Sequence, residues 1–140
     1  MTYIGIIGIG FVGNAMLNSF LQKGLSKNKL VTYDKFKDGG IGNFESCLNC
    51  EILFLALPTE FDFNLKEYDK NAIFDTLQKL SNSKFKGLIV IKSTVEPGTC
   101  EQFSNIFDGL KIVHNPEFLS VKTALEDFNN QKHIVLGKTT

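Results

Sequence analysis

The stretch Tyr3-Ile4-Gly5-Ile6-Ile7-Gly8-Ile9-Gly10-Phe11-Val12-Gly13 decides the fold. Its first six residues are apolar and rich in β-branched side chains, which is typical of a parallel strand buried on both faces. Three glycines follow in the pattern G-x-G-x-x-G, and helical periodicity then runs from Phe11 to Lys23. The sequence therefore predicts a buried strand, a glycine-rich turn and a helix.

This strand–turn–helix context predicts a phosphate-binding turn. In such a turn the first glycine permits the tight bend, the second lets the backbone approach a pyrophosphate, and the third brings helix and strand together. The unpaired N–H groups and the dipole at the helix N-terminus favour an anion. The alternative is a tight turn with a purely structural role. The residues expected to bind the cofactor here are Gly8, Ile9, Gly10, Phe11, Val12 and Gly13.

An acid closes the second predicted strand, about 20 residues after the turn, as dinucleotide-binding folds require. This residue is Asp34, at the end of Leu30–Tyr33. Its carboxylate can accept hydrogen bonds from ribose hydroxyls and repels a 2′-phosphate, which favours NAD over NADP. Lys35 and Lys37 oppose this preference, because a basic neighbour can hold the extra phosphate. We expect NAD as the cofactor and include Lys35 in its site.

The rest of the chain alternates between strand and helix patterns. Apolar runs predict strands at 52–57, 87–91, 110–113 and 134–136, and helical periodicity predicts helices at 44–49, 68–80 and 99–107. Strands joined by crossovers predict a parallel, right-handed sheet. We expect one α/β domain over residues 1–140, a Rossmann-type doubly wound parallel sheet of about six strands with helices on both faces.

Composition narrows the possible partners. The formal net charge is zero and no run of like charges occurs, which argues against nucleic-acid and membrane partners. The apolar runs are too short for a membrane helix, and an odd count of three cysteines argues against a disulfide framework. Cys47 and Cys50 form one C-x-x-C pair, but a zinc site needs two more ligands and no second pair occurs. We therefore expect reduced structural thiols and no metal. We also expect a cytoplasmic protein.

Three motifs begin where predicted strands end, namely Ala56–Thr59, Lys92–Thr99 and Asn115–Leu119. Open α/β sheets bind ligands at the carboxyl ends of their strands, so we expect these motifs to line one crevice. Thr94 is the best candidate for a hydroxyl near the nicotinamide or a reacting water. A turn and a strand cap are the alternative roles. The cofactor residues expected from these motifs are Leu57, Pro58, Thr59, Ser93 and Thr94.

Together with Thr123–Asp127 and His133–Gly137, these motifs resemble the N-terminal NAD-binding domain of the UDP-glucose/GDP-mannose dehydrogenase family, over nearly the whole chain. The resemblance implies an NAD-dependent nucleotide-sugar 6-dehydrogenase that oxidises a sugar CH2OH group to a carboxylate. It also implies that Thr94 and Glu117 are catalytic. The substrate-binding residues that it implies are Asn115, Pro116, Glu117, Phe118 and Leu119.

The chain also departs from the family pattern. The family's catalytic cysteine belongs to a later part of its sequence, and neither Cys47, Cys50 nor Cys100 matches it. Val121 stands where the family commonly has a second glutamate after Glu117. The family also has a lysine a few residues after the acid that corresponds to Asp34, and this position is Gly39 here. Lys35 or Lys37 would take the place of that lysine.

We therefore expect this chain to bind NAD without turnover, with the catalytic C-terminal part absent. The alternatives are a non-catalytic dinucleotide-binding module and a cofactor domain like those of 3-hydroxyacid dehydrogenases. The particular nucleotide sugar and the oligomeric state stay open.

Overall fold

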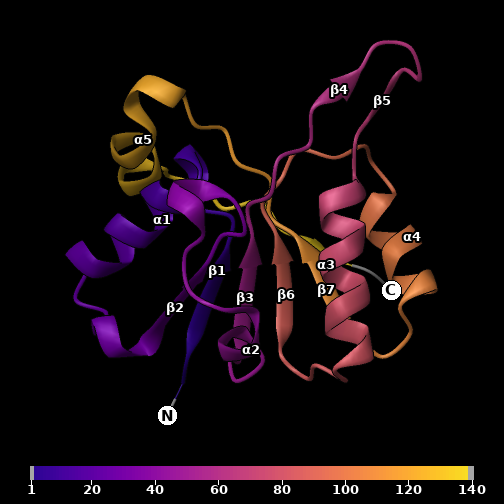
Figure 1. The fold of residues 1–140 in the computed structure, drawn as a ribbon. Helices are drawn as coiled ribbons and strands as arrows, with labels where there is room; N and C mark the ends of the chain where they lie inside the picture. The colour runs from indigo at the N-terminus through magenta and orange to yellow at the C-terminus, as the bar shows by residue number, and fades with distance from the viewer. Residues whose placement is uncertain (1, 139–140) are drawn as a thin grey trace.

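A six-stranded sheet organises the computed structural model of the protein, which describes residues 2–138. The strand order is β2-β1-β3-β6-β7-β8, so the chain moves outward in one direction from β1 to β2 and in the other from β3 onward (Figure 1). This reversal places the ligand-binding crevice of such a sheet at the ends of β1 and β3. The parallel strands are β1 (Ile4–Ile7), β2 (Leu30–Tyr33), β3 (Ile52–Leu55), β6 (Leu88–Ile91) and β7 (Lys111–His114).

Helices cover both faces of the sheet, as the α/β prediction requires (Figure 1). The α-helices are α1 (Phe11–Gln22), α2 (Phe44–Cys47), α3 (Asn71–Asn82), α4 (Thr99–Ile106) and α5 (Ala124–Asn130). Short 3-10 turns lie at Lys27–Lys29, Lys37–Gly39 and Val121–Thr123. None of the helices within residues 2–138 combines the length and the apolar character needed to cross a bilayer.

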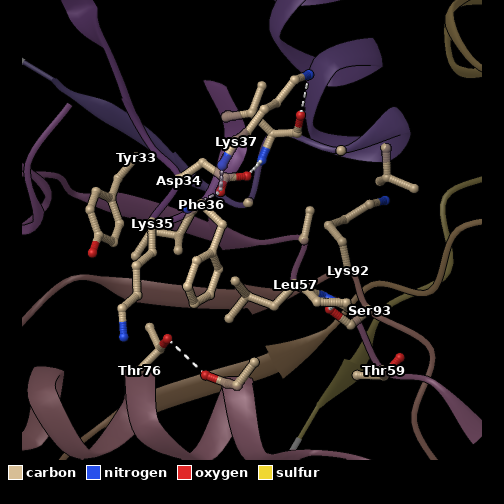
Figure 2. Close-up of a pocket in the computed structure, with 18 of the residues that line it drawn as sticks. Tyr33, Asp34, Lys35, Phe36, Lys37, Leu57, Thr59, Thr76, Lys92 and Ser93 are labelled. Carbon is tan, nitrogen blue, oxygen red and sulfur yellow. Dashed lines mark hydrogen bonds between the residues drawn. The ribbon is translucent and has the colours of Figure 1, made fainter. Parts of the chain in front are cut away.

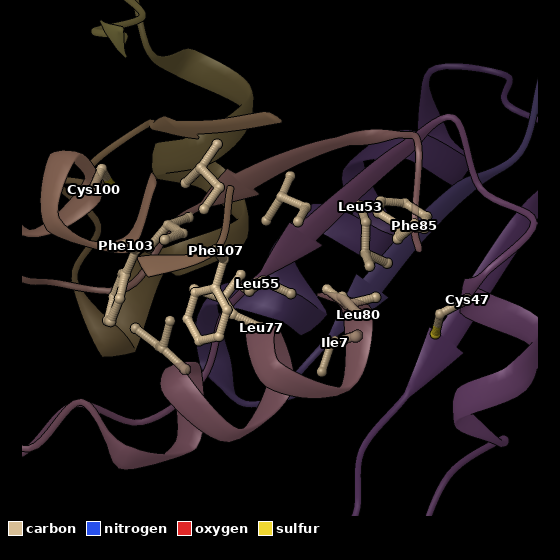
Figure 3. Packing of buried hydrophobic residues seen from close by; sticks show 14 of the residues in the cluster. Ile7, Cys47, Leu53, Leu55, Leu77, Leu80, Phe85, Cys100, Phe103 and Phe107 are labelled. Carbon is tan, nitrogen blue, oxygen red and sulfur yellow. The ribbon is translucent and has the colours of Figure 1, made fainter. Parts of the chain in front are cut away.

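Two hydrophobic cores fill the space between sheet and helices, because successive side chains of a strand point to opposite faces. Ile6 of β1 packs with α1 and α5 on one face, whereas Ile7 packs with α3 and α4 on the other. In the second core, side chains of β3 interlock with Leu77 and Leu80 of α3 and with Phe103 and Phe107 (Figure 3). The Rossmann-type fold class predicted from the sequence is confirmed.

The predicted sixth strand at 134–136 is wrong in place and direction. The structure instead has a two-residue strand, β8 (Gly137–Lys138), that pairs antiparallel with β7 and makes the sheet mixed. The side-chain amide of Asn115 donates to the Val135 carbonyl at 2.8 Å. Residues 134–136 are therefore held by a side-chain hydrogen bond and not by the backbone pairing of a strand. His133 precedes β8 and lies outside any strand.

A hairpin was missed between β3 and α3. It consists of β4 (Phe61–Asp62) and β5 (Glu67–Tyr68), and its turn is closed by the Asp62 carboxylate, which accepts the N–H groups of Asn64 and Leu65. Because Tyr68 belongs to the hairpin, α3 starts at Asn71 and not at residue 68. The other predicted strands and helices agree with the structure to within about two residues, the usual uncertainty of element ends.

A pair of leucines tests the core. Leu77 is 0% exposed and Leu65 is 67% exposed. We expect Leu77→Ala to lower the free energy of unfolding by about 2–5 kcal/mol, because the deletion leaves a cavity that the packed core cannot close. Leu65→Ala, the same change at the hairpin tip, should cost less than about 0.5 kcal/mol. Urea unfolding followed by circular dichroism measures both, and equal losses would contradict the assigned core.

Candidate functional site

A cleft of about 1110 Å³ opens at the carboxyl ends of the central strands (Figure 2). It gathers residues from the glycine-rich turn, the end of β2 and the three motifs Ala56–Thr59, Lys92–Thr99 and Asn115–Leu119, which lie far apart in the sequence. The predicted site residues that line it are Gly8, Ile9, Gly10, Phe11, Val12, Asp34, Lys35, Leu57, Pro58, Thr59, Ser93, Thr94 and Glu117. The predicted site residues outside its lining are Gly13, Asn115, Pro116, Phe118 and Leu119.

The three glycines of the turn differ in the space around them. Gly8 has a φ of +94°, and a Cβ there would lie 2.4 Å from the Ala56 carbonyl oxygen. At Gly13 a Cβ would lie 1.9 Å from the Gly8 carbonyl oxygen, so only glycine lets α1 pack this closely against the turn. At Gly10 a Cβ would meet no atom within 4 Å, because this position faces open space.

The N-terminus of α1 is left free to bind an anion. Gly10, its N-cap residue, makes no side-chain cap hydrogen bond, and no acidic residue lies in the first turn. The first N–H groups of a helix have no partner within the helix. These N–H groups and the positive end of the helix dipole therefore favour a negatively charged group beside the glycine-rich turn.

Asp34 joins the β2 loop to this turn. Its carboxylate accepts the N–H groups of Ile9 at 2.8 Å and of Phe36 and Lys37 at 3.0 Å each. Burial alone would raise the pKa of this carboxyl group, but the hydrogen bonds with Lys37, Ile9 and Phe36 outweigh burial and hold the pKa below its usual value. Asp34 is therefore an anion that both braces the turn and faces the cleft.

The two lysines that follow Asp34 differ in what they contact. The Lys37 ammonium donates to the Ile9 carbonyl oxygen at 2.6 Å, as the dashed contacts in Figure 2 show. The Lys35 ammonium lies 5.2 Å from the ring centre of Phe36. The Lys37 ammonium adds positive charge beside Asp34 and bonds the glycine-rich turn, whereas Lys35 contacts the Phe36 ring.

The hydroxyls after β3 and β6 mainly join the two strand ends. The Thr59 hydroxyl donates to the Thr94 carbonyl at 2.6 Å, and the Ser93 hydroxyl donates to the Leu57 carbonyl at 2.7 Å. Thr94 itself is exposed in the cleft. This arrangement leaves Thr94, rather than Ser93, with a hydroxyl available to a ligand.

Of the segment Asn115–Leu119, Glu117 alone reaches the cleft. One oxygen of its carboxylate accepts the N–H of Leu119 at 2.6 Å, so part of its capacity is used by its own loop. Phe118 is 79% exposed and points away from the core, whereas Leu119 packs against the core formed by α1 and α5. Backbone contacts with a ligand remain the expected role of this segment.

A buried lysine follows β6, at the start of the Lys92–Thr99 motif, and the sequence did not identify it as a site residue. Lys92 is 2% exposed, lines the cleft, and donates to the Asn115 side-chain oxygen at 2.9 Å. Burial lowers the pKa of Lys92, and the nearby charge of Glu117 acts in the opposite direction. The sequence signal for Lys92 was a charged residue directly after the apolar run 87–91. Such a lysine is expected to be buried only where it has a specific partner.

The far end of the cleft is apolar and was not predicted. Aromatic and aliphatic groups from β2, its loop and α3 line it, and Figure 2 shows several of them near Leu57. Flat apolar walls with a few polar groups suit a planar ring. The lining residues at this end are Tyr33, Phe36, Phe44, Leu57, Ala72, Thr76 and Lys79.

The three cysteines lie outside the cleft lining and are free and buried. Burial raises the pKa of Cys47 to about 12 and those of Cys50 and Cys100 to about 11, so all three are protonated at neutral pH. Their burial supports a structural role for these thiols. Within residues 2–138, no cluster of three or more His, Cys, Asp or Glu side chains could hold a metal ion.

A doubly wound sheet, a glycine-rich turn at an uncapped helix N-terminus and an acid at the end of β2 define a dinucleotide-binding Rossmann domain. Residues 41–140 match the family model of the UDP-glucose/GDP-mannose dehydrogenase family, NAD binding domain. The chain belongs to this family, and it is an NAD-binding domain.

Relatives support the assignment. The chain is 29% identical to a UDP-glucose 6-dehydrogenase of Campylobacter jejuni, with 96% of this chain and 41% of the relative covered. It is 37% identical to a UDP-glucose 6-dehydrogenase of Rickettsia felis, with 88% and 27% covered. The chain thus spans about two fifths or less of the relatives that it matches.

Solved structures confirm the fold. A GDP-mannose dehydrogenase from Pseudomonas aeruginosa matches with a TM-score of 0.71 at 19% identity, covering 98% of this chain and 41% of the other. A 3-hydroxyisobutyrate dehydrogenase from Mycobacterium tuberculosis matches with a TM-score of 0.68 at 16% identity, covering 90% and 44%. These neighbours share the architecture, while the family model separates the chain from the hydroxyacid enzymes.

An ion pair beside the cleft anchors the hairpin of β4 and β5. The Glu96 carboxylate, two residues after Thr94, accepts the N–H of Tyr68 at 2.7 Å and the ammonium of Lys70 at 2.9 Å. The hydrogen bond with Tyr68, followed by that with Lys70, lowers the pKa of Glu96 from 4.5 to about 2. The depressed pKa means that folding favours the ionised form.

This pKa predicts a pH-dependent contribution to stability. A carboxyl group with a depressed folded-state pKa stabilises the fold above its unfolded-state pKa and loses this effect as pH falls through the folded-state value. We expect wild type to be more stable than Glu96→Gln at pH 7, and the difference to shrink as pH falls from about 4.5 to about 2. Urea unfolding at a series of pH values measures it. Glu60→Gln removes one exposed charge from the same hairpin as a control, and a pH-independent difference for Glu96→Gln would refute the assignment.

Proposed function

We propose that this chain is the cofactor-binding part of an NAD-dependent nucleotide-sugar 6-dehydrogenase, which oxidises a sugar CH2OH group to a carboxylate. The family membership and the relatives named UDP-glucose 6-dehydrogenase support this activity. The observation that carries it is the uncapped N-terminus of α1 beside the open space at Gly10, with the Asp34 carboxylate facing the same cleft.

The residues present fit NAD along the whole length of the cleft. The turn Gly8–Val12 holds the diphosphate with backbone N–H groups, and Gly13 acts by its close packing against the turn. Asp34 holds the hydroxyls of the adenosine ribose, and Lys35 adds positive charge beside them. The apolar end around Tyr33 takes the adenine ring. Pro58, Thr59, Ser93 and Thr94 form the wall at the nicotinamide end, and Leu57 lies at the apolar end with the adenine ring.

In this proposal NAD would accept the hydride that leaves the sugar, and the change from CH2OH to carboxylate would require two NAD molecules and one water. Thr94 presents its hydroxyl to the reacting group or to a water, and Glu117 exchanges a proton or orients that water. Asn115, Pro116, Phe118 and Leu119 complete the grip on the nucleotide sugar, largely through backbone groups. Lys92 keeps the carbonyl oxygen of the Asn115 side chain fixed at the base of this segment.

The nucleophilic thiol of the family lies outside this chain. Cys47, Cys50 and Cys100 are buried with raised pKa values, and a nucleophilic cysteine needs an accessible thiolate. The isolated chain therefore binds NAD without turnover. Free thiols also suit a reducing compartment, so the proposal places the enzyme in the cytoplasm. It requires neither a nucleic acid nor a membrane.

A non-catalytic dinucleotide-binding module is the second candidate. Val121 favours it, because this residue is 69% exposed and carries no group that can exchange a proton where the family commonly has a glutamate. The complete gene product, supplied with NAD and either UDP-glucose or GDP-mannose, separates the two candidates. NADH formation supports the dehydrogenase, whereas NAD binding with no turnover of either sugar supports the module.

A methyl group at Gly10 tests where the diphosphate binds. We expect Gly10→Ala to keep the stability of the fold within about 0.5 kcal/mol, because its Cβ meets no atom within 4 Å. Its affinity for NAD should fall about tenfold or more, because the methyl group occupies the space through which the diphosphate approaches the backbone. Calorimetric titration with NAD and urea unfolding measure the two effects.

Gly13→Ala is the contrasting variant, since its Cβ would lie 1.9 Å from the Gly8 carbonyl oxygen and it should lose stability as well as affinity. Unchanged NAD affinity in folded Gly10→Ala would overturn the proposed diphosphate position. No affinity of wild-type chain for NAD would overturn the proposed function.

The missing thiol gives a further expectation. The isolated chain, mixed with NAD and UDP-glucose or GDP-mannose, should produce no NADH above the rate without protein. Absorbance of NADH over time measures this. Formation of the sugar carboxylate with two NADH per sugar by the isolated chain would show that the reaction does not need a nucleophile outside these residues.

A further inference from the structure

Two successive peptide groups of the glycine-rich turn are held by side chains from the β2 loop. The Asp34 carboxylate accepts the N–H of Ile9 at 2.8 Å, and this N–H belongs to the peptide group between Gly8 and Ile9. The Lys37 ammonium donates to the Ile9 carbonyl at 2.6 Å, which belongs to the next peptide group, between Ile9 and Gly10. A carboxylate and an ammonium thus fix consecutive peptide planes.

Fixing the Ile9 carbonyl also fixes the N–H of Gly10. A peptide group is planar and trans, so its C=O and N–H point in opposite directions. The Gly10 N–H makes no hydrogen bond within residues 2–138, and Gly10 lies in the cleft lining. The bond from Lys37 therefore orients a free N–H at the point where the proposed diphosphate binds.

We propose that Lys37 is a positioning residue for the cofactor, which acts through the Ile9 carbonyl to keep the Gly10 N–H turned toward the diphosphate. This inference rests on the proposed function. It also assigns to Lys37 a role different from holding a 2′-phosphate, because its ammonium is committed to the turn and lies beside the ionised Asp34. Lys37 thereby strengthens the binding of every diphosphate ligand without favouring NADP.

The bond has a suitable chemical character for this role. A hydrogen bond from an ammonium to a carbonyl is charge-assisted and stronger than a neutral one. Lys37 is exposed, so water competes for its ammonium and the effect on affinity is moderate. The neighbouring Lys35 contacts the Phe36 ring and not the turn, so the positioning role belongs to Lys37.

Substitutions at Lys37 test the inference. We expect Lys37→Met to weaken binding of NAD and of ADP about fivefold, while adenosine, which has no phosphate, binds unchanged. Lys37→Arg should recover most of the affinity, because a guanidinium can still donate to the Ile9 carbonyl. The ratio of NAD to NADP affinity should stay the same in Lys37→Met. Calorimetry measures the affinities for NAD, NADP and ADP, and NMR titration measures the affinity for adenosine.

A ligand-free measurement makes the test independent of cofactor binding. In Lys37→Met, the amide signal of Gly10 should shift and exchange with solvent faster than in wild type. The control is Lys27→Met, which removes the same charge from an exposed site outside the cleft lining and should change neither the Gly10 amide nor the NAD affinity.

Three results would overturn the inference. A loss confined to NADP would show that Lys37 holds the 2′-phosphate. A loss of NAD affinity that disappears at high salt, with the Gly10 amide unchanged, would show long-range attraction alone. An unchanged Gly10 amide and unchanged affinity would show that the bond has no role. Failure of the wild-type chain to bind NAD would refute the proposed function. The Gly10 amide signal without ligand would still test whether the bond from Lys37 to the Ile9 carbonyl orients the Gly10 N–H.

Discussion

The packing of α1 against the end of β1 is the constraint from which the site follows. Gly13 lies so close to the Gly8 carbonyl that any side chain at position 13 would collide with it. This contact sets where the helix begins and which N–H groups face the cleft. The positive φ of Gly8 and the carbonyl of Ala56, the residue after β3, fix the other side of the turn. The donors of this anion site are thus backbone N–H groups, and the close packing around them requires glycine at positions 8 and 13.

Side chains from the β2 loop then stabilise this backbone. Three N–H groups around the Asp34 carboxylate keep its pKa below the usual value, and the same hydrogen bonds hold the carboxylate against the turn. The hydroxyls of Thr59 and Ser93 perform a similar task between the ends of β3 and β6. Most polar groups of the cleft therefore have structural bonds already formed, and such preorganisation lowers the cost of ordering the site around a ligand.

The sequence was sufficient to predict features that depend on local pattern. The glycines of the turn, Asp34 at a strand end and the apolar periodicity of the central strands all have short-range signatures, and each was located correctly. Features that depend on distant partners were not predicted. Lys92 is held in the cleft lining by contacts with Asn115 and Phe128, and the hairpin of β4 and β5 is fixed by bonds from Tyr68 and Lys70 to the distant Glu96. The position of β8 likewise depends on pairing with β7, which an apolar run does not encode.

The hairpin of β4 and β5 leaves and rejoins the body of the domain at almost the same place. Thr59 bonds the Thr94 carbonyl at its start, and Tyr68 and Lys70 bond Glu96 at its end. Because both ends are tied to one short segment, residues added or removed at the tip change little beyond the entropy of closing a loop, which grows slowly with length. This part of the chain can accordingly diverge in size and sequence among homologues while the cleft wall keeps its shape.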